Sequence, residues 1–307
     1  MDRRKFLKQV SLWSAGLIAA PPVFNITPKL FASIQKPAVM VAKGENYPAM
    51  VNTIVSRLGG INAFVKTGDT VVIKPNIAWD RTIEQGANTH PLVVETLVLL
   101  CLDAGASKVS VFDRTCNEER RCYTSSGIRP ALEKIKDKRF SLEYIDDRKF
   151  IPVDIKKGTA LKQWSFYKDA LEADCYINVP VAKHHSWSHL SLGIKNIMGV
   201  IGGRRGMLHI GLEEKLADLN TVIRPTLTII DATRVITDNG PQGGSMADVK
   251  KLDTIIGSQD PVAADAYAST LFGYKPEDLG TTVAAHKKGL GQMDLNKCDV
   301  QYLNQFA

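Results

Sequence analysis

The chain has 307 residues, of which 44% are apolar and 23% charged, an ordinary composition for a globular protein. It excludes disordered, collagen-like and coiled-coil proteins, and no apolar run approaches the roughly 18 residues of a membrane span. The formal net charge is +7, but +4 of it lies before residue 34, and so mildly basic a remainder predicts no nucleic-acid partner.

A basic head and a short apolar run open the chain. Arg3 and Arg4 precede the apolar residues 10–20, which Pro21 ends. This order is typical of an export signal, and the paired arginines resemble the twin-arginine signal. We therefore predict a signal over residues 1–33, export to the periplasm by the twin-arginine machinery, and a membrane anchor if the signal is not cleaved. The alternative is the basic, amphipathic start of a cytosolic protein.

Strand and helix patterns alternate through the rest of the chain. Apolar, β-branched runs predict strands over residues 38–42, 69–74, 108–113, 141–145, 175–179, 226–231 and 252–256. Helical patterns cover residues 48–58, 91–104 and 261–271, and Thr89 and Asp260 are the expected N-caps of the last two. The alternation predicts an α/β fold with a largely parallel sheet and helices on both faces.

Residues 34–307 are expected to form a single α/β domain. They contain no internal repeat, low-complexity tract or Pro/Gly/Ser-rich linker. A polar stretch near residues 146–158 is the expected boundary if this domain has two lobes.

The five cysteines do not predict a disulfide scaffold. They are widely spaced and form no C-x-x-C pair, so an iron–sulfur cluster of the chain's own is not expected. Cys116 and Cys122 flank a charged loop, and whether they pair stays open.

Polar clusters follow four predicted strands. Ligands of parallel α/β sheets bind beyond the carboxyl ends of the strands, so a site is expected where these clusters meet. The clusters are Lys74-Pro75-Asn76, Asp113-Arg114, Lys183-His184-His185 and Asp231.

The densest group of chemically active residues lies in residues 180–212. Four of the six histidines occur there, with six glycines and no Asp or Glu. Cationic donors without a competing carboxylate predict a site for a small carboxylate or phosphate, or for an anionic cofactor. We expect His185 or His184 to move protons. The expected ligand-binding residues are Lys74, Asn76, Lys183, Lys195 and Asn196.

Histidine spacing raises the alternative of a transition metal. His185 and His189 are four residues apart and would share one face of a helix. Imidazole ligands favour Zn, Ni, Cu or Fe, and we assign His189 and His209 as metal ligands, either of the ion or of a metal-containing cofactor. The competing interpretation is that each histidine is a hydrogen-bonded structural residue.

Six motifs in order resemble the family known as domain of unknown function 362. The resemblance spans residues 39–273 and implies an α/β domain without supplying a reaction. Members are often fused to ferredoxin-type iron–sulfur modules, which implies a redox partner. The motifs cover residues 72–76, 89–91, 178–185, 195–199, 240–244 and 260–265.

A fainter resemblance is to the nickel-pincer lactate racemase family. His185, Lys195 ten residues later and His209 fourteen beyond that carry it. It implies that His185 is an acid/base, that Lys195 holds the pincer nucleotide and that His209 ligates nickel. The spacing to His209 differs from the family's, and the family's Thr-Arg-Pro signature is absent near Lys74.

Two functions are consistent with these patterns. The first is an exported metal- or cofactor-dependent enzyme, isomerase or redox-linked, that acts on a small anionic substrate. The second is a non-catalytic periplasmic carrier of an anionic cofactor or a binder of an iron–sulfur partner.

Overall fold

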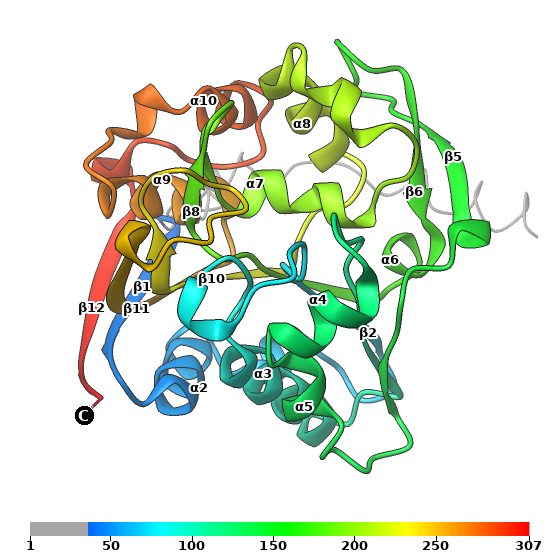
Figure 1. Cartoon of the computed structure of the whole chain (residues 1–307), viewed down its shortest axis with the longest axis vertical. Helices are drawn as coiled ribbons and strands as arrows, with labels where there is room; N and C mark the ends of the chain where they lie inside the picture. The colour runs from blue at the N-terminus through cyan, green and yellow to red at the C-terminus, as the bar shows by residue number, and fades with distance from the viewer. Residues whose placement is uncertain (1–35, 307) are drawn as a thin grey trace, which may run out of the picture. The chain divides into compact units, whose positions relative to one another are not determined.

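An eight-stranded sheet forms the centre of the computed structural model, which describes residues 36–306 (Figure 1). Its strands are β1 (Ala38–Gly44), β2 (Thr70–Pro75), β3 (Lys108–Val111), β4 (Phe140–Leu142), β7 (Cys175–Val179), β10 (Leu227–Ile236), β11 (Val249–Ser258) and β12 (Asp299–Phe306). They lie in the order β12-β1-β11-β10-β7-β2-β3-β4. All neighbours are parallel except the two pairs that β11 makes, so the predicted α/β fold is confirmed. The predicted signal, residues 1–33, lies outside the described residues.

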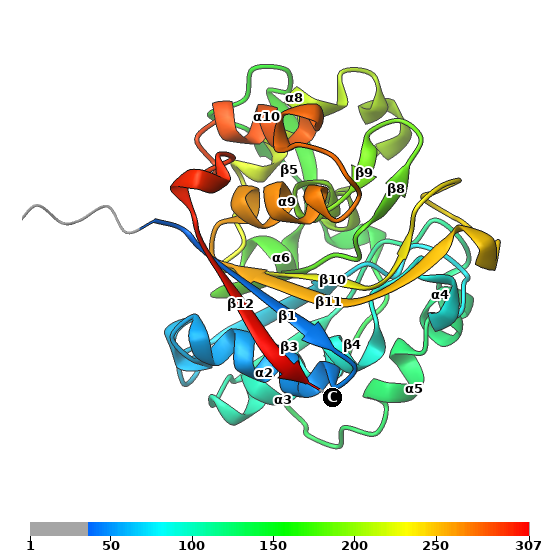
Figure 2. The same ribbon diagram turned by 90° about the vertical axis from the view of Figure 1, so that its left-hand side faces the viewer.

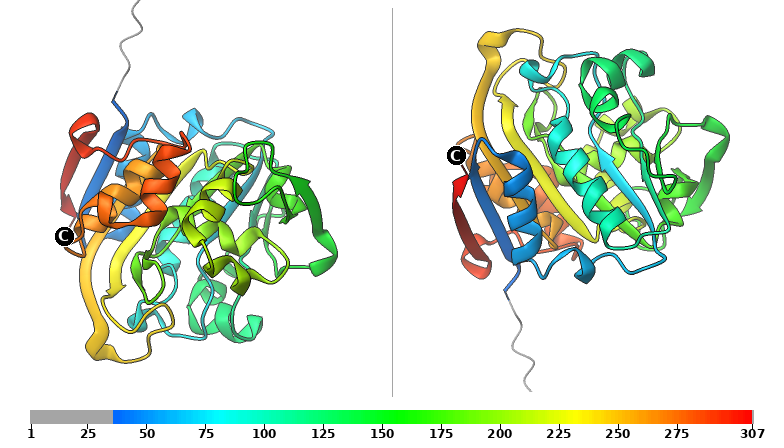
Figure 3. Two further views of the ribbon diagram at one scale, coloured as in Figure 1. Left: turned by 90° about the horizontal axis from the view of Figure 1, so that it is seen from above. Right: turned by 90° about the horizontal axis from the view of Figure 1, so that it is seen from below.

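Helices cover both faces of the sheet, as predicted. One face carries α2 (Tyr47–Arg57), α3 (Pro91–Asp103) and α5 (Ile128–Leu132). The opposite face carries α7 (Gly193–Asn196), α8 (Leu212–Asn220), α9 (Pro261–Thr270) and α10 (Gly280–Lys287). Figure 2 shows the sheet edge-on between these two layers, and Figure 3 shows each layer from outside. The remaining helices are α4 (Glu119–Ser125) and α6 (Lys168–Leu171).

Two small hairpins lie outside the main sheet. They pair β5 (Phe150–Asp154) with β6 (Gln163–Tyr167) and β8 (Lys183–His185) with β9 (His189–Ser191). Single turns of 3-10 helix join the larger elements: η1 (Ile61–Ala63), η2 (Ile83–Gln85), η3 (Asp147–Lys149), η4 (Ile197–Val200), η5 (Arg205–His209), η6 (Met246–Asp248), η7 (Pro276–Asp278) and η8 (Leu295–Lys297). Within residues 36–306, no helix has both the length and the apolarity to cross a membrane.

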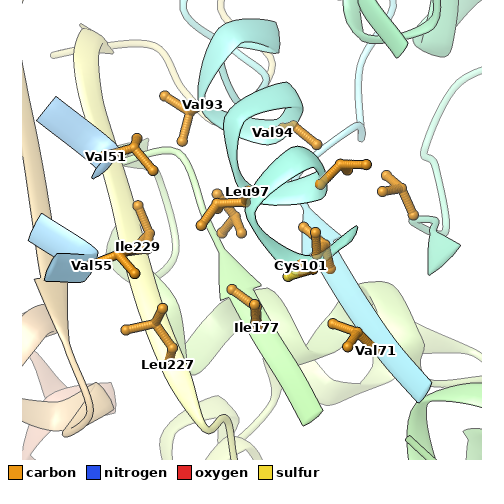
Figure 4. Close-up of a cluster of buried hydrophobic side chains, with 14 of the residues drawn as sticks. Val51, Val55, Val71, Val93, Val94, Leu97, Cys101, Ile177, Leu227 and Ile229 are labelled. Atoms are coloured by element: carbon orange, nitrogen blue, oxygen red, sulfur yellow. The ribbon is translucent and has the colours of Figure 1, made fainter. Parts of the chain in front are cut away.

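Strand alternation decides which side chains reach each face. Val71 of β2 packs into the core beneath α3, together with Ile177 of β7 (Figure 4). Ile73 of β2 belongs to the same buried cluster. Burial of an aliphatic side chain of this size stabilises the fold by roughly 1.5–3 kcal/mol. Val72 packs on the other face, against the α7 and α8 side. Because side chains alternate along a strand, Lys74 follows Val72 onto that second face.

The helix starts follow the sequence with one difference. Asp260 caps α9 as predicted, because its Oδ1 accepts from the backbone N–H groups of Val262 and Ala263, at 2.9 Å each. Thr89 does not cap α3, whose N-cap is His90. Instead the Thr89 hydroxyl accepts from the Asn76 N–H and donates to the Val179 carbonyl, so it joins the ends of β2 and β7.

Candidate functional site

A cavity of about 640 Å³ lies beyond the carboxyl ends of β7, β2 and β3, which are neighbours in the sheet. This is where ligands of parallel α/β sheets bind. The hairpin β8–β9, helix α7 and the turn η5 close its other side. Of the predicted site residues, seven line it: Lys74, Asn76, Lys183, His185, Lys195, Asn196 and His209.

The cavity is strongly cationic. Three of its cations are lysines, and Arg114 and Arg205 are the other two. Among the residues that the structure describes, Asp113 is the one carboxylate on the lining. Its Oδ1 lies 2.9 Å from Lys74 Nζ, and both side chains are 1% exposed. The cavity therefore keeps a positive excess even after this ion pair is counted.

Two glycines allow close packing at the cavity: Gly199 lets η4 approach the ends of β2 and β3, and Gly193 lets α7 approach α9. A Cβ on Gly199 would lie 1.8 Å from Asp113 Oδ1 and 2.2 Å from Lys74 Cε, so only glycine fits beside the ion pair. A Cβ on Gly193 would lie 2.7 Å from Asp265 Oδ1. Asp265 accepts instead from the backbone N–H groups of Gly193, at 2.7 Å, and Ile194, at 2.9 Å. Burial raises the pKa of Asp265 to about 7, and these two hydrogen bonds oppose that rise.

The two predicted asparagines hold lysines in place. Asn196 of α7 accepts from Lys74 Nζ and donates to Asn178 Oδ1 at 2.8 Å. Asn76 Oδ1 accepts from Lys183 Nζ at 2.9 Å, and the Ala87 carbonyl accepts a second bond from the same ammonium. Both amides therefore act on the lysines, which fixes the positions of two of the cavity's charges.

Lys195 has the most donors left for a ligand. Within residues 36–306 its Nζ makes one hydrogen bond, to Ser188 Oγ at 2.9 Å. Burial, with the charge of Lys183 next, lowers the pKa of Lys195 to about 7. Burial also lowers the pKa of Lys183 to about 7, and it lowers that of Lys74 against the attraction of Asp113. A bound anion would counteract these shifts, because its negative charge stabilises the charged form of each lysine.

His185 and His209 face each other across the cavity lining. Their rings stack with centroids 5.6 Å apart and planes 14° apart. His185 Nδ1 accepts from the backbone N–H of Trp187 at 3.1 Å, so a neutral His185 carries its proton on Nε2. His209 Nδ1 lies 3.1 Å from the Gly206 carbonyl, which only accepts, so a neutral His209 has its lone pair on Nε2.

Burial and the nearby Lys195 lower the pKa of His185 to about 3. His185 is therefore a neutral hydrogen-bond donor near neutral pH. The Nε2 atoms of the two neutral rings therefore differ: that of His185 donates a hydrogen bond, and that of His209 accepts one.

The other two predicted histidines lie elsewhere. His184 precedes His185 on β8, so its side chain points to the opposite side and lines a second cavity of about 410 Å³. Its Nδ1 accepts from the Gly240 N–H at 3.0 Å. His189 is the register partner of His185 across β8–β9, since this segment is a hairpin and not a helix. The His189 ring packs against Tyr274, with centroids 5.7 Å apart.

The described residues do not fit a metal ion held by protein ligands alone. The structure does not bring His189 and His209 together, since His209 lines the cavity and His189 does not. No group of three or more His, Cys, Asp or Glu in residues 36–306 is arranged to hold a metal. A free cation would also be repelled by the ammonium and guanidinium groups. An anion fits this lining.

Sequence reasoning missed the two arginines as a pair. Arg205 donates to the carbonyls of Arg114 and Thr115, at 2.8 and 2.7 Å, and Arg114 donates to those of Ile201 and Gly203. They brace the loop after β3 against η5. Asp113-Arg114 was visible as a strand-end cluster, but nothing local in the sequence links it to Arg205.

The cysteines are free in the structure. Cys116 is exposed on the cavity lining, and Cys122 is buried in α4 with its thiol 3.7 Å from the Ala78 carbonyl. In the structure, Cys116 and Cys122 are therefore not joined by a disulfide.

Fold and cavity together define an α/β protein with a cation-lined cavity at the carboxyl ends of its parallel strands. The chain belongs to the family described as Domain of unknown function (DUF362), whose pattern matches residues 71–270. This confirms the family resemblance of the sequence motifs. The Thylakoid-associated protein sll1697 of Synechocystis sp. is 26% identical over 250 residues, which cover 79% of this chain and 75% of that protein.

Two solved structures are similar to the chain. One is the lactate racemase apoprotein from Thermoanaerobacterium thermosaccharolyticum, with a TM-score of 0.48, 11% identity and 76% of this chain covered. The other is a protein from Thermotoga maritima, with a TM-score of 0.44, 11% identity and 75% covered. The chain spans 56% and 60% of their lengths, respectively.

Proposed function

We propose that the chain is an enzyme that binds a small carboxylate or phosphate compound in this cavity and catalyses a proton transfer to or from that compound. One observation carries the proposal: within residues 36–306, five cationic side chains and a single carboxylate, itself paired with Lys74, line one cavity. Buried charges are normally paired, so an excess of cations on a cavity wall favours an anionic occupant.

Lys195 is the residue that we expect to bind the anion directly. Its ammonium has one partner, Ser188 Oγ, among the described residues, and it lines the cavity. A charge-assisted hydrogen bond to an anion contributes about 1.5–3 kcal/mol. Lys183 is held by Asn76 and adds a second charge. Lys74 stays paired with Asp113 and supports the wall.

Proton transfer is assigned to the stacked pair His185 and His209. His185 Nε2–H donates a hydrogen bond to the ligand, in the way that a neutral imidazole polarises a bound oxygen. His209 Nε2 has the lone pair that accepts a proton. An anion near the pair would raise the lowered pKa of His185, because it stabilises the charged form of this imidazole.

The chemical test starts from protein purified from its natural host. Mass spectrometry after denaturation should release a stoichiometric carboxylate or phosphate compound, and elemental analysis of the same sample shows whether a metal accompanies it. With the released class as substrate, His185→Ala should retain the ligand and lose turnover. A sample without any bound anion, whose affinity for phosphate and acetate is also undetectable, would contradict the proposal.

A non-catalytic carrier is the second candidate. The lowered pKa of His185 favours it, because burial keeps this imidazole neutral and makes it a weak base near neutral pH while the cavity is without an anion. The carrier predicts that Lys195→Met weakens ligand retention and that no substrate class turns over. Turnover that depends on His185 and His209 would contradict the carrier.

We also propose that the chain is exported by the twin-arginine route and acts at or near a membrane. The predicted signal and the thylakoid-associated relative support this location. Fractionation of the natural host tests it: the chain is expected in the periplasmic or membrane fraction, and replacing Arg3 and Arg4 by lysine should leave it in the cytoplasm. A redox partner stays part of this proposal, because members of the family are often fused to ferredoxin-type iron–sulfur modules.

A further inference from the structure

We infer that the anion that this cavity binds carries a flat apolar body, which lies against Trp187 at the cavity mouth. The inference rests on the proposed function. In that function the lysines hold the anionic part of a ligand, and the inference adds an apolar part to the same ligand. It follows from three observations: the size of the cavity, the distribution of charge along its lining, and an exposed aromatic and aliphatic rim.

The cavity is much larger than an inorganic anion. Its volume of about 640 Å³ is within the range of roughly 300–1,000 Å³ that encloses drug-sized ligands. The three lysines are buried, so they can contact only the innermost part of such a ligand. The remaining volume has room for a part of the ligand that the lysines do not reach.

Aromatic rings lead from the buried lysines to the surface. His185 is buried, His209 stacks on it at 5.6 Å, and Trp187 meets His209 edge-on with centroids 5.7 Å apart. Trp187 is 70% exposed although it lines the cavity. A row of rings that rises out of a cavity is suited to a flat apolar group, which gains stacking or edge contacts along it.

Two exposed aliphatic side chains lie close to His209 in the chain. Met207 and Ile210 are 58% and 69% exposed, and they follow the lining residues Gly206 and His209 directly without lining the cavity themselves. Large apolar residues left exposed beside a cavity favour an apolar partner there, and Trp187 is the one of these three that lies on the lining itself. The rim adjoins the cationic lining, so an occupant of both must be anionic at one end and apolar at the other.

The probes are matched pairs that differ only in the apolar body: inorganic phosphate against naphthyl phosphate, and acetate against naphthoate. Affinities are measured by isothermal titration calorimetry on the full chain. We expect the naphthyl member of at least one pair to bind about tenfold more tightly or better, since one stacked ring contributes that much.

Variants separate the rim from the anion site. Trp187→Ala should abolish this advantage and leave the affinity for the small anion within about twofold, while Trp187→Phe should retain most of it. Met207→Ser tests the aliphatic part independently. Tyr302→Ala, an equally exposed aromatic on the edge strand β12, is the matched control and should change nothing.

Each failure has its own meaning. Equal affinities within both pairs, or an advantage that survives Trp187→Ala, would overturn the inference while phosphate or acetate binding upholds the proposed function. Loss of all binding would overturn both. Binding to phosphatidylglycerol vesicles through Trp187 and Met207, without any naphthyl advantage, would instead make the rim a membrane-contact surface and overturn the inference.

Discussion

Lys74 Nζ lies 2.9 Å from Asp113 Oδ1 in the floor of the cavity, and both side chains are almost completely excluded from solvent. Asp113 Oδ2 also accepts from the backbone N–H of Ile77 at 2.6 Å. The pair joins the ends of β2 and β3 and removes the Asp113 carboxylate from competition with an anionic ligand.

Asp113→Asn should be strongly destabilising because it leaves the Lys74 ammonium buried without its partner. Loss of one member of a buried pair costs about 3–5 kcal/mol in the free energy of unfolding. The double variant Lys74→Met with Asp113→Asn should recover much of this, since no charge is then left alone and the amide oxygen can still accept from Ile77. Urea unfolding measures the free energy of unfolding of both variants. Equal decreases in the single and the double variant would contradict the pairing of Lys74 with Asp113.

Gly199→Ala should disturb the same place by steric overlap. The added methyl group has no room beside Lys74 and Asp113, and overpacking of a dense interior costs about 1–3 kcal/mol. Gly206→Ala is the matched control on the same segment, because a Cβ at that position would have nothing within 4 Å of it. Thermal unfolding should separate the two variants. Similar stabilities would mean that η4 does not approach the ion pair as closely as described.

His185 should stay neutral from pH 5 to pH 8 in the ligand-free protein. Its pKa of about 3 is set by burial and the neighbouring lysine. Nitrogen-15 NMR of the imidazoles should show a protonated Nε2 and an unprotonated Nδ1 on His185 across this range. His286, whose Nδ1 lies 2.8 Å from the Gly291 carbonyl, is a reference outside the cavity with the opposite tautomer expected. A His185 midpoint near pH 6.5 would contradict the description of its surroundings.

The affinity for phosphate should decrease as the pH rises above about 7. The pKa values of Lys183 and Lys195 are about 7 without a ligand, and a bound anion raises them. The protein therefore takes up protons on binding, and tighter binding is expected where the lysines are already charged, below pH 7. Calorimetry between pH 6 and pH 9 in two buffers of different ionisation enthalpy measures this uptake. An affinity that is constant over this range would be incompatible with it.

Stability of the ligand-free protein should show the opposite trend. Both lysines have folded pKa values below the unfolded value near 10.5, so the unfolded chain binds more protons between pH 7 and pH 10. Their contribution to the free energy of unfolding therefore rises over this interval. The Lys183→Met and Lys195→Met variants should flatten the rise in urea titrations. A decrease of stability over the same interval that these variants do not change would contradict the burial of the lysines.

Much of the sheet follows from the sequence because its strands are buried apolar runs with clear ends. All seven predicted strands occur in the main sheet. The eighth, β12, has the alternating polar sequence of an edge strand and was missed. The direction of β11 was also not predictable, since pairing direction depends on which strand comes to lie beside it.

The site was predictable in composition and only partly in geometry. Strand ends predicted that Lys74, Asn76 and Lys183 would meet, and the three residues line one cavity. The four-residue spacing of His185 and His189 suits a helix, but a tight hairpin separates them as well, and local sequence does not decide between the two. The side chains of His184 and His185 point to opposite sides because successive residues of a strand alternate, but this follows only once residues 183–185 are known to form β8. Arg205 reaches the cavity only through the fold.

Phosphate binding to the full chain and to Lys195→Met tests the central claim most directly, with Lys134→Met, an exposed lysine beyond α5, as control. Calorimetry at pH 6.5 should give an affinity for the unchanged chain and for Lys134→Met that agree within about twofold. Lys195→Met should bind about tenfold more weakly or worse, since one charge-assisted hydrogen bond is lost. Equal affinities in all three proteins would show that the anion binds elsewhere, and the account of the cavity would be wrong.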